Sequence, residues 1–305
     1  MTTEKIFDEA LKNILSEDEI LKDEPMKHHT TFRVGGPAEY YLRPKKEQVA
    51  EVLRLCLTYQ KEYLIIGNGS NLLVSDKGIS GVVIEIGKQM DEITVDGTTI
   101  YAQAGAMLSK TAHAALEAGL TGMEFAAGIP GCVGGAVVMN AGAYGGEMKD
   151  ILKSVTVLTA DGQEKELTPG ELNMSYRHSS ITEEHYMVLG VTIALEAGSQ
   201  EQIRAKMEEL KEKRVEKQPL EYPSAGSTFK RPEGYFAGKL IMDAGLRGFQ
   251  VGGAAVSEKH CGFVINKEKA TASDVYQLIQ EVQQEVYRQF GVKLETEVKM
   301  VGDFR

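Results

Sequence analysis

The order of hydrophobic and polar positions along the chain predicts a mixture of helices and strands. Residues 4–21 carry apolar side chains at helical spacing and predict an acidic amphipathic helix. Beyond residue 38, short apolar runs predict strands and longer runs with helical periodicity predict helices. The predicted strands are residues 39–43, 63–66, 82–86, 92–95, 98–102, 155–159, 164–167, 187–195, 262–266 and 294–300. The predicted helices are residues 46–60, 107–118, 200–217, 236–244 and 273–290.

Two of these helices indicate that the chain has an N-terminal and a C-terminal part. The helix predicted at 200–217 is highly charged and lacks a strong apolar face, which suits a connector between domains. The helix predicted at 273–290 carries an apolar stripe that requires a second core. The pattern therefore predicts an α+β protein whose parts, of about 195 and about 105 residues, are both of ordinary domain size.

Glycine is the residue whose abundance changes this picture. The chain has 32 glycines among 305 residues, and nine of them fall within residues 119–146. Residues 125–146 carry no charge and are long enough to span a bilayer, but seven of them are glycine and one is proline. We therefore interpret this stretch as loops whose backbone approaches a flat ligand closely, and we expect no membrane span.

Charge and cysteine content exclude several classes of function. The chain has 34 Lys plus Arg and 44 Asp plus Glu, a net charge of −10, which disfavours nucleic acid and anionic membranes as partners. Its three cysteines lie far apart without metal-ligand spacing, so we expect no disulfide framework and no bound metal. Charged residues near the N-terminus, where a signal peptide would be apolar, predict a cytoplasmic protein.

The first candidate for chemistry is the Gly-Asn-Gly-Ser-Asn sequence at 67–71, which follows an apolar strand. Consecutive backbone N–H groups in such a turn can bind phosphate, although a lone Gly-x-Gly more often marks only a tight turn. Leu72 replaces the third glycine of a Rossmann fingerprint, and residues 81–89 fail the spacing of a P-loop. A dinucleotide bound here would therefore require a different fold.

Three further motifs carry polar groups suited to an anionic substrate. Arg177 lies among hydroxyl residues at 175–179 and can hold a carboxylate with two hydrogen bonds. Ser227 lies in a loop of small residues followed by two cations, without the Gly-x-Ser-x-Gly pattern of a serine hydrolase. Glu297 lies on the charged face of the strand predicted at 294–300. Taken singly, these motifs are more typical of a surface ion pair, a polar loop and a solvated strand face than of a catalytic site.

Together and in this order, the motifs resemble the UDP-N-acetylenolpyruvoylglucosamine reductases of bacterial peptidoglycan synthesis. The matching stretches are residues 30–38, 67–73, 128–147, 175–179, 223–232, 252–256 and 297–298. They span nearly the whole chain. Only a short run separates Ser179 from Val188, so the chain resembles the compact subclass that lacks an extra substrate-covering insertion.

The resemblance implies a flavoenzyme of the vanillyl-alcohol-oxidase, or PCMH, type. It implies an N-terminal helical arm at 1–29 and an FAD-binding domain at 30–197 with two α+β subdomains, about 30–90 and 91–197. An α+β substrate-binding domain would follow at 198–305. FAD would be noncovalent, because no histidine lies in 67–71 to tether it.

The implied reaction is NADPH-dependent reduction, via FAD, of the enolpyruvyl group of UDP-N-acetylglucosamine enolpyruvate to UDP-N-acetylmuramate. By resemblance, Ser227 protonates the substrate, Arg177 binds its carboxylate, and Glu297 would need to be protonated to donate a hydrogen bond. Substrate contacts would come from Lys217, Lys230 and Arg231. We expect a monomer whose partners are these small molecules.

The resemblance also implies the cofactor contacts, which concentrate on the glycine-rich loops. They are Arg33, Gly67, Asn68, Gly69, Ser70, Asn71, Leu72, Gly128, Ile129, Pro130, Gly131, Val133, Gly134, Asn140, Ala141, Gly142 and Arg214. Cys132 departs from the family pattern, which usually has serine or threonine there, so we expect a weaker contact to FAD at that position.

Two other functions share some of these features. A flavin oxidase or dehydrogenase of the same fold would act on a small hydroxy acid, and a non-catalytic regulator would bind flavin without turnover. Neither accounts for Arg177, Ser227 and Glu297 occurring together with the glycine-rich loops.

Overall fold

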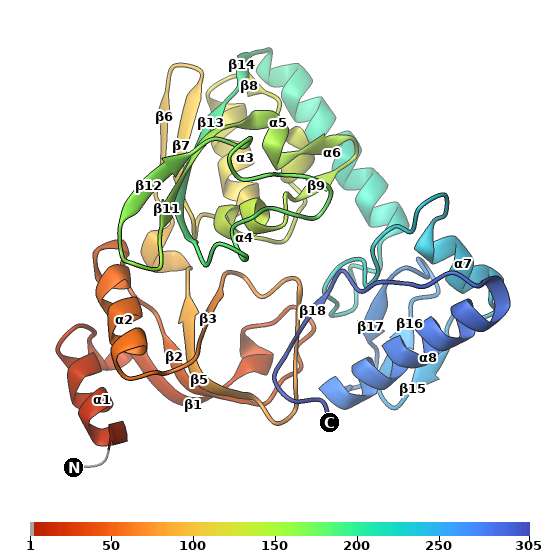
Figure 1. The fold of residues 1–305 in the computed structure, drawn as a ribbon. Coiled ribbons are helices and arrows are strands. Elements are labelled where there is room, and N and C mark those ends of the chain that lie inside the picture. The colour runs from red at the N-terminus through yellow and green to blue at the C-terminus, as the bar shows by residue number, and fades with distance from the viewer. Residues whose placement is uncertain (1–2) are drawn as a thin grey trace. The chain divides into compact units, whose positions relative to one another are not determined.

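The computed structural model describes residues 3–305, and these fold into two units (Figure 1). The first unit contains the chain up to Leu21, then Tyr40–Asn68 and Gly81–Lys213. The second contains Lys22–Glu39, Gly69–Ser80 and Arg214–Arg305. Each unit is thus assembled from three separate segments. The first glycine-rich loop is divided between the units, after Asn68.

Helices α1 and α2 and a four-stranded sheet form the N-terminal layer. The elements are α1 (Thr3–Lys12), the 3-10 turns η1 (Glu17–Glu19) and η2 (Met26–His28), α2 (Lys46–Thr58) and the sheet β1 (Ile20–Pro25), β2 (Pro37–Leu42), β5 (Ile79–Glu85) and β3 (Tyr63–Ile66), in that order. The prediction of a helix over 4–21 is wrong beyond Lys12. Ser16 N donates a hydrogen bond to Glu19 Oε2 at 2.9 Å, and the Ser16 hydroxyl donates to Asp18 Oδ1. Such local hydrogen bonds compete with those of a helix.

A five-stranded antiparallel sheet forms the body of the first unit. Its order is β12 (Glu164–Leu167), β11 (Leu152–Leu158), β13 (Met187–Ala194), β7 (Thr99–Gln103) and β6 (Ile93–Asp96). Around it lie η3 (Lys88–Met90), α3 (Leu108–Glu117), β8 (Leu120–Thr121), η4 (Glu124–Ala126), α4 (Val133–Val138), β9 (Gly142–Ala143), β10 (Gly146–Glu147), α5 (Met148–Ile151) and β14 (Glu196–Ala197). The glycine-rich stretch was predicted as loops alone, but it contains the short helix α4.

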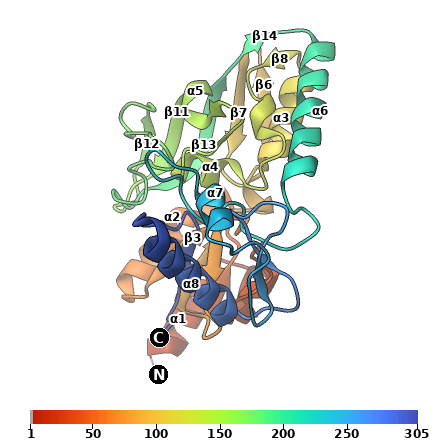
Figure 2. The same ribbon diagram turned by 90° about the vertical axis from the view of Figure 1, so that its right-hand side faces the viewer.

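Helix α6 (Gln200–Lys217) has the predicted bounds. Its buried residues are Ile203, Met207 and Leu210, so it has a narrow apolar stripe and, as predicted, no strong apolar face. Near its start, Gln200 Nε2 donates to the Glu117 carbonyl at the end of α3 (both helices are labelled in Figure 2). Three apolar residues at helical spacing are enough to pack a helix against its unit even when most of its other positions are charged or polar.

Helix α8 (Ala272–Phe290) forms the core of the second unit. It packs on the sheet β15 (Gln250–Val251), β16 (Ala254–Val256) and β17 (Val264–Asn266), with α7 (Ala237–Asp243) beside it. Thr271 and Asp274 form a capping box at its start, and Gly291 ends it in the left-handed conformation with φ of 68°. The predicted apolar stripe is confirmed from Val275 to Val286, where its members are fully buried, but its predicted last member, Phe290, is exposed.

The C-terminal strand is shorter than predicted. β18 (Lys299–Val301) pairs in parallel with β4 (Leu72–Val74), which places the first glycine-rich loop next to the end of the chain. Residues 294–298 are not a strand, so that prediction is wrong there. Their alternation reflects burial of Leu294 and Val298, while single backbone bonds tie the segment to the loop containing Ser227. Within residues 3–305, none of the helices combines the length and the hydropathy needed to cross a bilayer.

Candidate active site

A buried asparagine joins two predicted motifs in the first unit. Asn140 follows helix α4 with a left-handed φ of 43° and is 1% exposed. Its Nδ2 donates to Glu147 Oε2 at 2.6 Å and to the Ser175 carbonyl oxygen at 3.0 Å. The glycine-rich stretch and the arginine motif, which lie about 35 residues apart in the sequence, are therefore fixed to each other.

Arg177 occupies a tight turn between Ser175 and His178, whose backbones exchange hydrogen bonds of 3.0 and 3.1 Å. Its φ is 55°, a conformation that costs a residue with a side chain of order 1–3 kcal/mol and that occurs preferentially at functional sites. Both terminal guanidinium nitrogens lie 3.4 Å from the Gly142 carbonyl oxygen. The turn thus brings Arg177 to a residue predicted to contact the cofactor.

Cys132 connects the start of helix α4 to the first glycine-rich loop. Its side chain is buried, and Asn68 Nδ2 donates to the nearby Pro130 carbonyl at 2.8 Å. Burial raises the pKa of the Cys132 thiol, against opposing hydrogen bonds from the backbone N–H groups of Gly135 and Asn68. A methyl group added at Gly67 would lie only 2.2 Å from Sγ. The sulfur therefore fills the space left by the missing Gly67 side chain.

The remainder of that loop, in the second unit, packs against the segment 29–33. Gly69 has φ of 59°, and a methyl group added there would lie 1.9 Å from the His29 carbonyl oxygen. Thr31 N donates to the Gly69 carbonyl at 3.3 Å. Because both conformation and space exclude a side chain, glycine is required at this position.

Ser227 and Glu297 lie on neighbouring segments of the second unit. Glu297 N donates to the carbonyl of Thr228, the residue after the serine, at 2.9 Å. Thr228 is fully buried, and its hydroxyl accepts from Val264 N at 2.9 Å. On the other side, Asn71 Nδ2 donates to the Glu297 carbonyl at 3.0 Å. The serine loop, the first glycine-rich loop and the glutamate segment are therefore held together by hydrogen bonds.

Comparison with known proteins assigns this arrangement to a family. A model of the UDP-N-acetylenolpyruvoylglucosamine reductase C-terminal domain matches residues 218–301, and an FAD binding domain model matches residues 38–168. A UDP-N-acetylenolpyruvoylglucosamine reductase of Agathobacter rectalis is 59% identical over 297 residues, covering 93% of this chain and 95% of that protein. The chain belongs to the UDP-N-acetylenolpyruvoylglucosamine reductase family.

Other relatives extend the match in sequence and structure. The Clostridium perfringens reductase of the same name is 53% identical and covers 97% of both chains. The crystal structure of the Thermus caldophilus reductase superposes with a TM-score of 0.79 at 36% identity, covering 91% of this chain and 97% of that one. An alkyldihydroxyacetonephosphate synthase, 18% identical with a TM-score of 0.50 over 63% of this chain and 40% of its own, shares the fold alone. The predicted fold class, a PCMH-type FAD-binding region followed by an α+β domain, is confirmed.

The residues of this reductase suit FAD. Thr31 Oγ1 is buried and has no hydrogen-bond partner among residues 3–305, and Thr31 N is bonded to Gly69. An unpartnered buried hydroxyl costs about 1–3 kcal/mol, and a polar oxygen of a bound cofactor would remove that cost. The remaining predicted cofactor contacts lie on the loops described above. They are Ser70 and Leu72 after Gly69, Gly128, Ile129 and Gly131 before helix α4, Val133 and Gly134 within it, and Ala141 after Asn140.

Two of the predicted substrate contacts have partners of their own. Lys230 Nζ lies 3.3 Å from Glu295 Oε2 in a largely exposed ion pair. The Arg231 guanidinium lies 4.0 Å from the centre of the exposed Phe236 ring. An exposed ion pair contributes about 1 kcal/mol or less, so Lys230 can exchange its partner at little cost.

The other predicted cations also belong to the second unit, whereas Arg177 belongs to the first. Arg33 is exposed and has φ of 56°. Arg214 Nε donates to Gln218 Oε1 at 2.8 Å, and Lys217, in the last turn of α6, is exposed. The structure thus groups Ser227, Glu297, loop 69–72 and most of the predicted cations within one unit.

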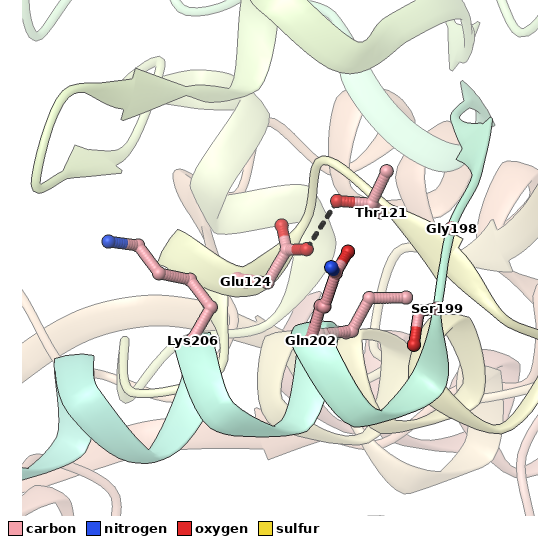
Figure 3. A pocket seen from close by; sticks show the side chains of 7 residues that line it. Thr121, Glu124, Gly198, Ser199, Gln202 and Lys206 are labelled. Atoms are coloured by element: carbon pink, nitrogen blue, oxygen red, sulfur yellow. Dashed lines mark hydrogen bonds between the residues drawn. The ribbon is translucent and has the colours of Figure 1, made fainter.

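A hollow of about 320 Å³ lies elsewhere, in the first unit (Figure 3). Its lining comes from the β8–η4 turn and the start of α6, and Thr121 Oγ1 donates to Glu124 Oε1 at 2.6 Å within it. None of the predicted site residues lines this hollow.

Three residues that position the site were not predicted from the sequence. Glu147 and Thr228 hold Asn140 and Glu297 through hydrogen bonds, and Thr31 carries the unpartnered hydroxyl. All three fall within stretches that resemble the family, but Thr228 and Thr31 are bonded to residues far away in the sequence, and Glu147 contacts Asn140 across the turn that follows helix α4. Only the fold reveals those partners.

Proposed function

We propose that this chain reduces the enolpyruvyl group of UDP-N-acetylglucosamine enolpyruvate to UDP-N-acetylmuramate for peptidoglycan synthesis. FAD is the cofactor and NADPH the reductant. Beyond family membership, one observation carries the assignment of residues. The hydrogen bond from Glu297 N to the Thr228 carbonyl places the segments of Ser227 and Glu297 next to each other.

Bound FAD supplies hydride transfer from NADPH to the terminal CH₂ carbon of the substrate. The glycine-rich loops, with Arg33 and Arg214, would hold it. Hydride addition leaves negative charge on the adjacent carbon and its carboxylate, which the protein must stabilise while it supplies one proton.

We assign that proton to Ser227. The hydroxyl of serine is a weak acid, so nearby cations must support the transient alkoxide. Lys230 lies three residues away, and its exposed ion pair with Glu295 leaves it able to turn toward the substrate.

Arg177 and Glu297 stabilise the negative charge in this proposal. The planar guanidinium of Arg177 binds the carboxylate with two hydrogen bonds. Glu297 acts in its protonated form as a hydrogen-bond donor, because an ionised carboxylate would repel the charge that develops. Lys217 and Arg231 bind the anionic groups of the substrate.

We further propose that residues 30–197 bind FAD and residues 198–305 bind the substrate. The matches of the two family models, to residues 38–168 and 218–301, support this division. The net charge of −10 supports a protein that binds neither nucleic acid nor membrane, and we expect a cytoplasmic monomer.

Stopped-flow measurement of Ser227→Ala tests the assignment. The variant is expected to be reduced by NADPH at nearly the normal rate, whereas its reoxidation by substrate should slow by about 10²–10⁴-fold, the usual contribution of a general acid. Ser224→Ala, in the same loop, is the matched control and should leave both rates unchanged. Normal reoxidation of Ser227→Ala would remove Ser227 from its role.

A further inference from the structure

The side chain of Asn140 is fully engaged within the protein. An asparagine amide has two N–H donors, and those of Asn140 go to Glu147 Oε2 and to the Ser175 carbonyl. Its Oδ1 accepts from Lys149 N at 2.9 Å. Asn140 therefore has no side-chain donor left for a cofactor, although the sequence pattern predicted it as an FAD contact.

The bond to Ser175 has a direct consequence for the turn that presents Arg177. The Ser175 carbonyl accepts two hydrogen bonds, from His178 N within the turn and from Asn140 Nδ2 outside it. The first closes the turn, and the second fixes it to the end of helix α4. Arg177 lies between them in a left-handed conformation that it would not adopt unsupported.

Asn140 is itself suited to this place. It follows α4 at φ of 43°, and asparagine tolerates the left-handed region better than other residues with side chains. The same position needs an amide, because the partly buried Glu147 oxygen and the Ser175 carbonyl both accept hydrogen bonds from it. Glycine could adopt the left-handed backbone conformation here, but it could not donate hydrogen bonds to Glu147 Oε2 and the Ser175 carbonyl.

We infer that Asn140 is a positioning residue for Arg177: it anchors the strained turn and so sets where the guanidinium meets the substrate carboxylate. This inference rests on the proposed role of Arg177 in the reduction. Displacing a group by about 1 Å from its productive position can cost about 100-fold in rate. Loss of the anchor should therefore slow the step that needs Arg177 and leave the reduction of FAD by NADPH unchanged.

A double-mutant cycle on the FAD-loaded enzyme tests the inference. Asn140→Gly keeps the backbone conformation and removes the amide, and Arg177→Ala removes the guanidinium. We expect Asn140→Gly to slow reoxidation by substrate about 10- to 100-fold in the wild-type background. In the Arg177→Ala background the same change should cost less than about threefold, because coupled residues are not additive.

Matched variants separate this role from a general loss of structure. Asn173→Gly replaces an exposed asparagine that also has a left-handed φ, of 48°, and should leave both half-reactions unchanged. Asn140→Asp has the same shape but lacks both donors, and should slow reoxidation as Asn140→Gly does. It serves as the second variant if the glycine form does not fold, as judged by the melting temperature of the apoprotein.

The affinity for FAD, measured by quenching of flavin fluorescence, provides a readout independent of turnover. Asn140→Gly should change this affinity by less than about threefold, since Arg177 rather than the cofactor depends on the amide. Weaker FAD binding with normal reoxidation at saturating FAD would overturn the inference, as would an equal loss in both backgrounds of the cycle. Wild-type reoxidation of Arg177→Ala would contradict the proposed function as well, and so distinguishes the two failures.

Discussion

Replacing Gly67 by alanine tests the contact between the first glycine-rich loop and Cys132. The added methyl group would lie 2.2 Å from Sγ, more than 1 Å short of the ~3.5–4.0 Å at which non-bonded atoms pack best. The sulfur is buried and accepts backbone N–H groups, so it cannot move away freely. Overpacking of this kind costs about 1–3 kcal/mol. At ~2–4 °C per kcal/mol, the ratio for a chain of 150–250 residues, we expect the melting temperature to fall by roughly 2–12 °C.

The structure also predicts how the damage can be repaired. Cys132→Ala removes Sγ and leaves Cβ as the nearest Cys132 atom, 3.8 Å from the new methyl group, which is an ordinary contact. The double variant Gly67→Ala/Cys132→Ala should therefore recover about 1–3 kcal/mol relative to the sum of the single changes. Thermal unfolding of the four apoproteins measures this coupling.

Gly135→Ala is the matched control for steric conflict with the same sulfur. Its methyl group would lie 3.6 Å from Sγ, and its position within helix α4 favours alanine over glycine, so no loss of stability is expected. If the losses of Gly67→Ala and Cys132→Ala simply add, the sulfur does not occupy the space in front of Gly67, and the reasoning fails.

Three further predictions concern single groups. Glu297→Gln should be reoxidised by substrate faster than Glu297→Ala, because the amide still donates a hydrogen bond; equal rates measured by stopped flow would refute a donor role. Burial lowers the pKa of His260 below its ordinary 6.5, so the unfolded chain binds the proton more readily and stability falls as the pH drops below about 6.5. His260→Asn keeps an acceptor for Gly262 N and should lose less melting temperature between pH 7.5 and 5.5 than wild type; parallel pH profiles would contradict this. All three cysteines are buried, and burial raises the pKa of Cys56 to about 11, so the thiols should react with a disulfide reagent only on unfolding; one rapidly reacting thiol in the native protein would be the opposite result.

Local periodicity was enough to predict many of the elements. Strands β3 and β12 and helix α6 have the predicted bounds, and α8 differs by one residue. Helix α8 has a repeating pattern of burial along its length, whereas β3 and β12 are short strands without one. The predictions failed where a local or distant partner outweighs the pattern. The first helix ends at Lys12, and Ser16, bonded to Glu19, begins a separate 3-10 turn. Residues 294–298 alternate in burial without forming a ladder.

The candidate site was likewise predicted only in part. Its residue types and their order were visible in the sequence, because an arginine among hydroxyls and dense glycines have recognisable chemistry. Their neighbours were not visible. The bond from Glu297 N to Thr228, the bond from Asn140 to Ser175 and the packing of Cys132 on Gly67 all join residues more than 30 positions apart. Such pairs depend on the path of the chain through the whole unit, which no short window of sequence contains.

Anaerobic reoxidation by the enolpyruvyl substrate tests the central claim most directly. The purified protein with bound FAD is bleached with one equivalent of NADPH and then mixed with UDP-N-acetylglucosamine enolpyruvate. We expect the visible flavin absorbance to return in proportion to the substrate added, with a product heavier by two hydrogen atoms. A bleached flavin that the enolpyruvyl substrate leaves unchanged, in a protein that instead consumes oxygen with small hydroxy acids, would contradict the account.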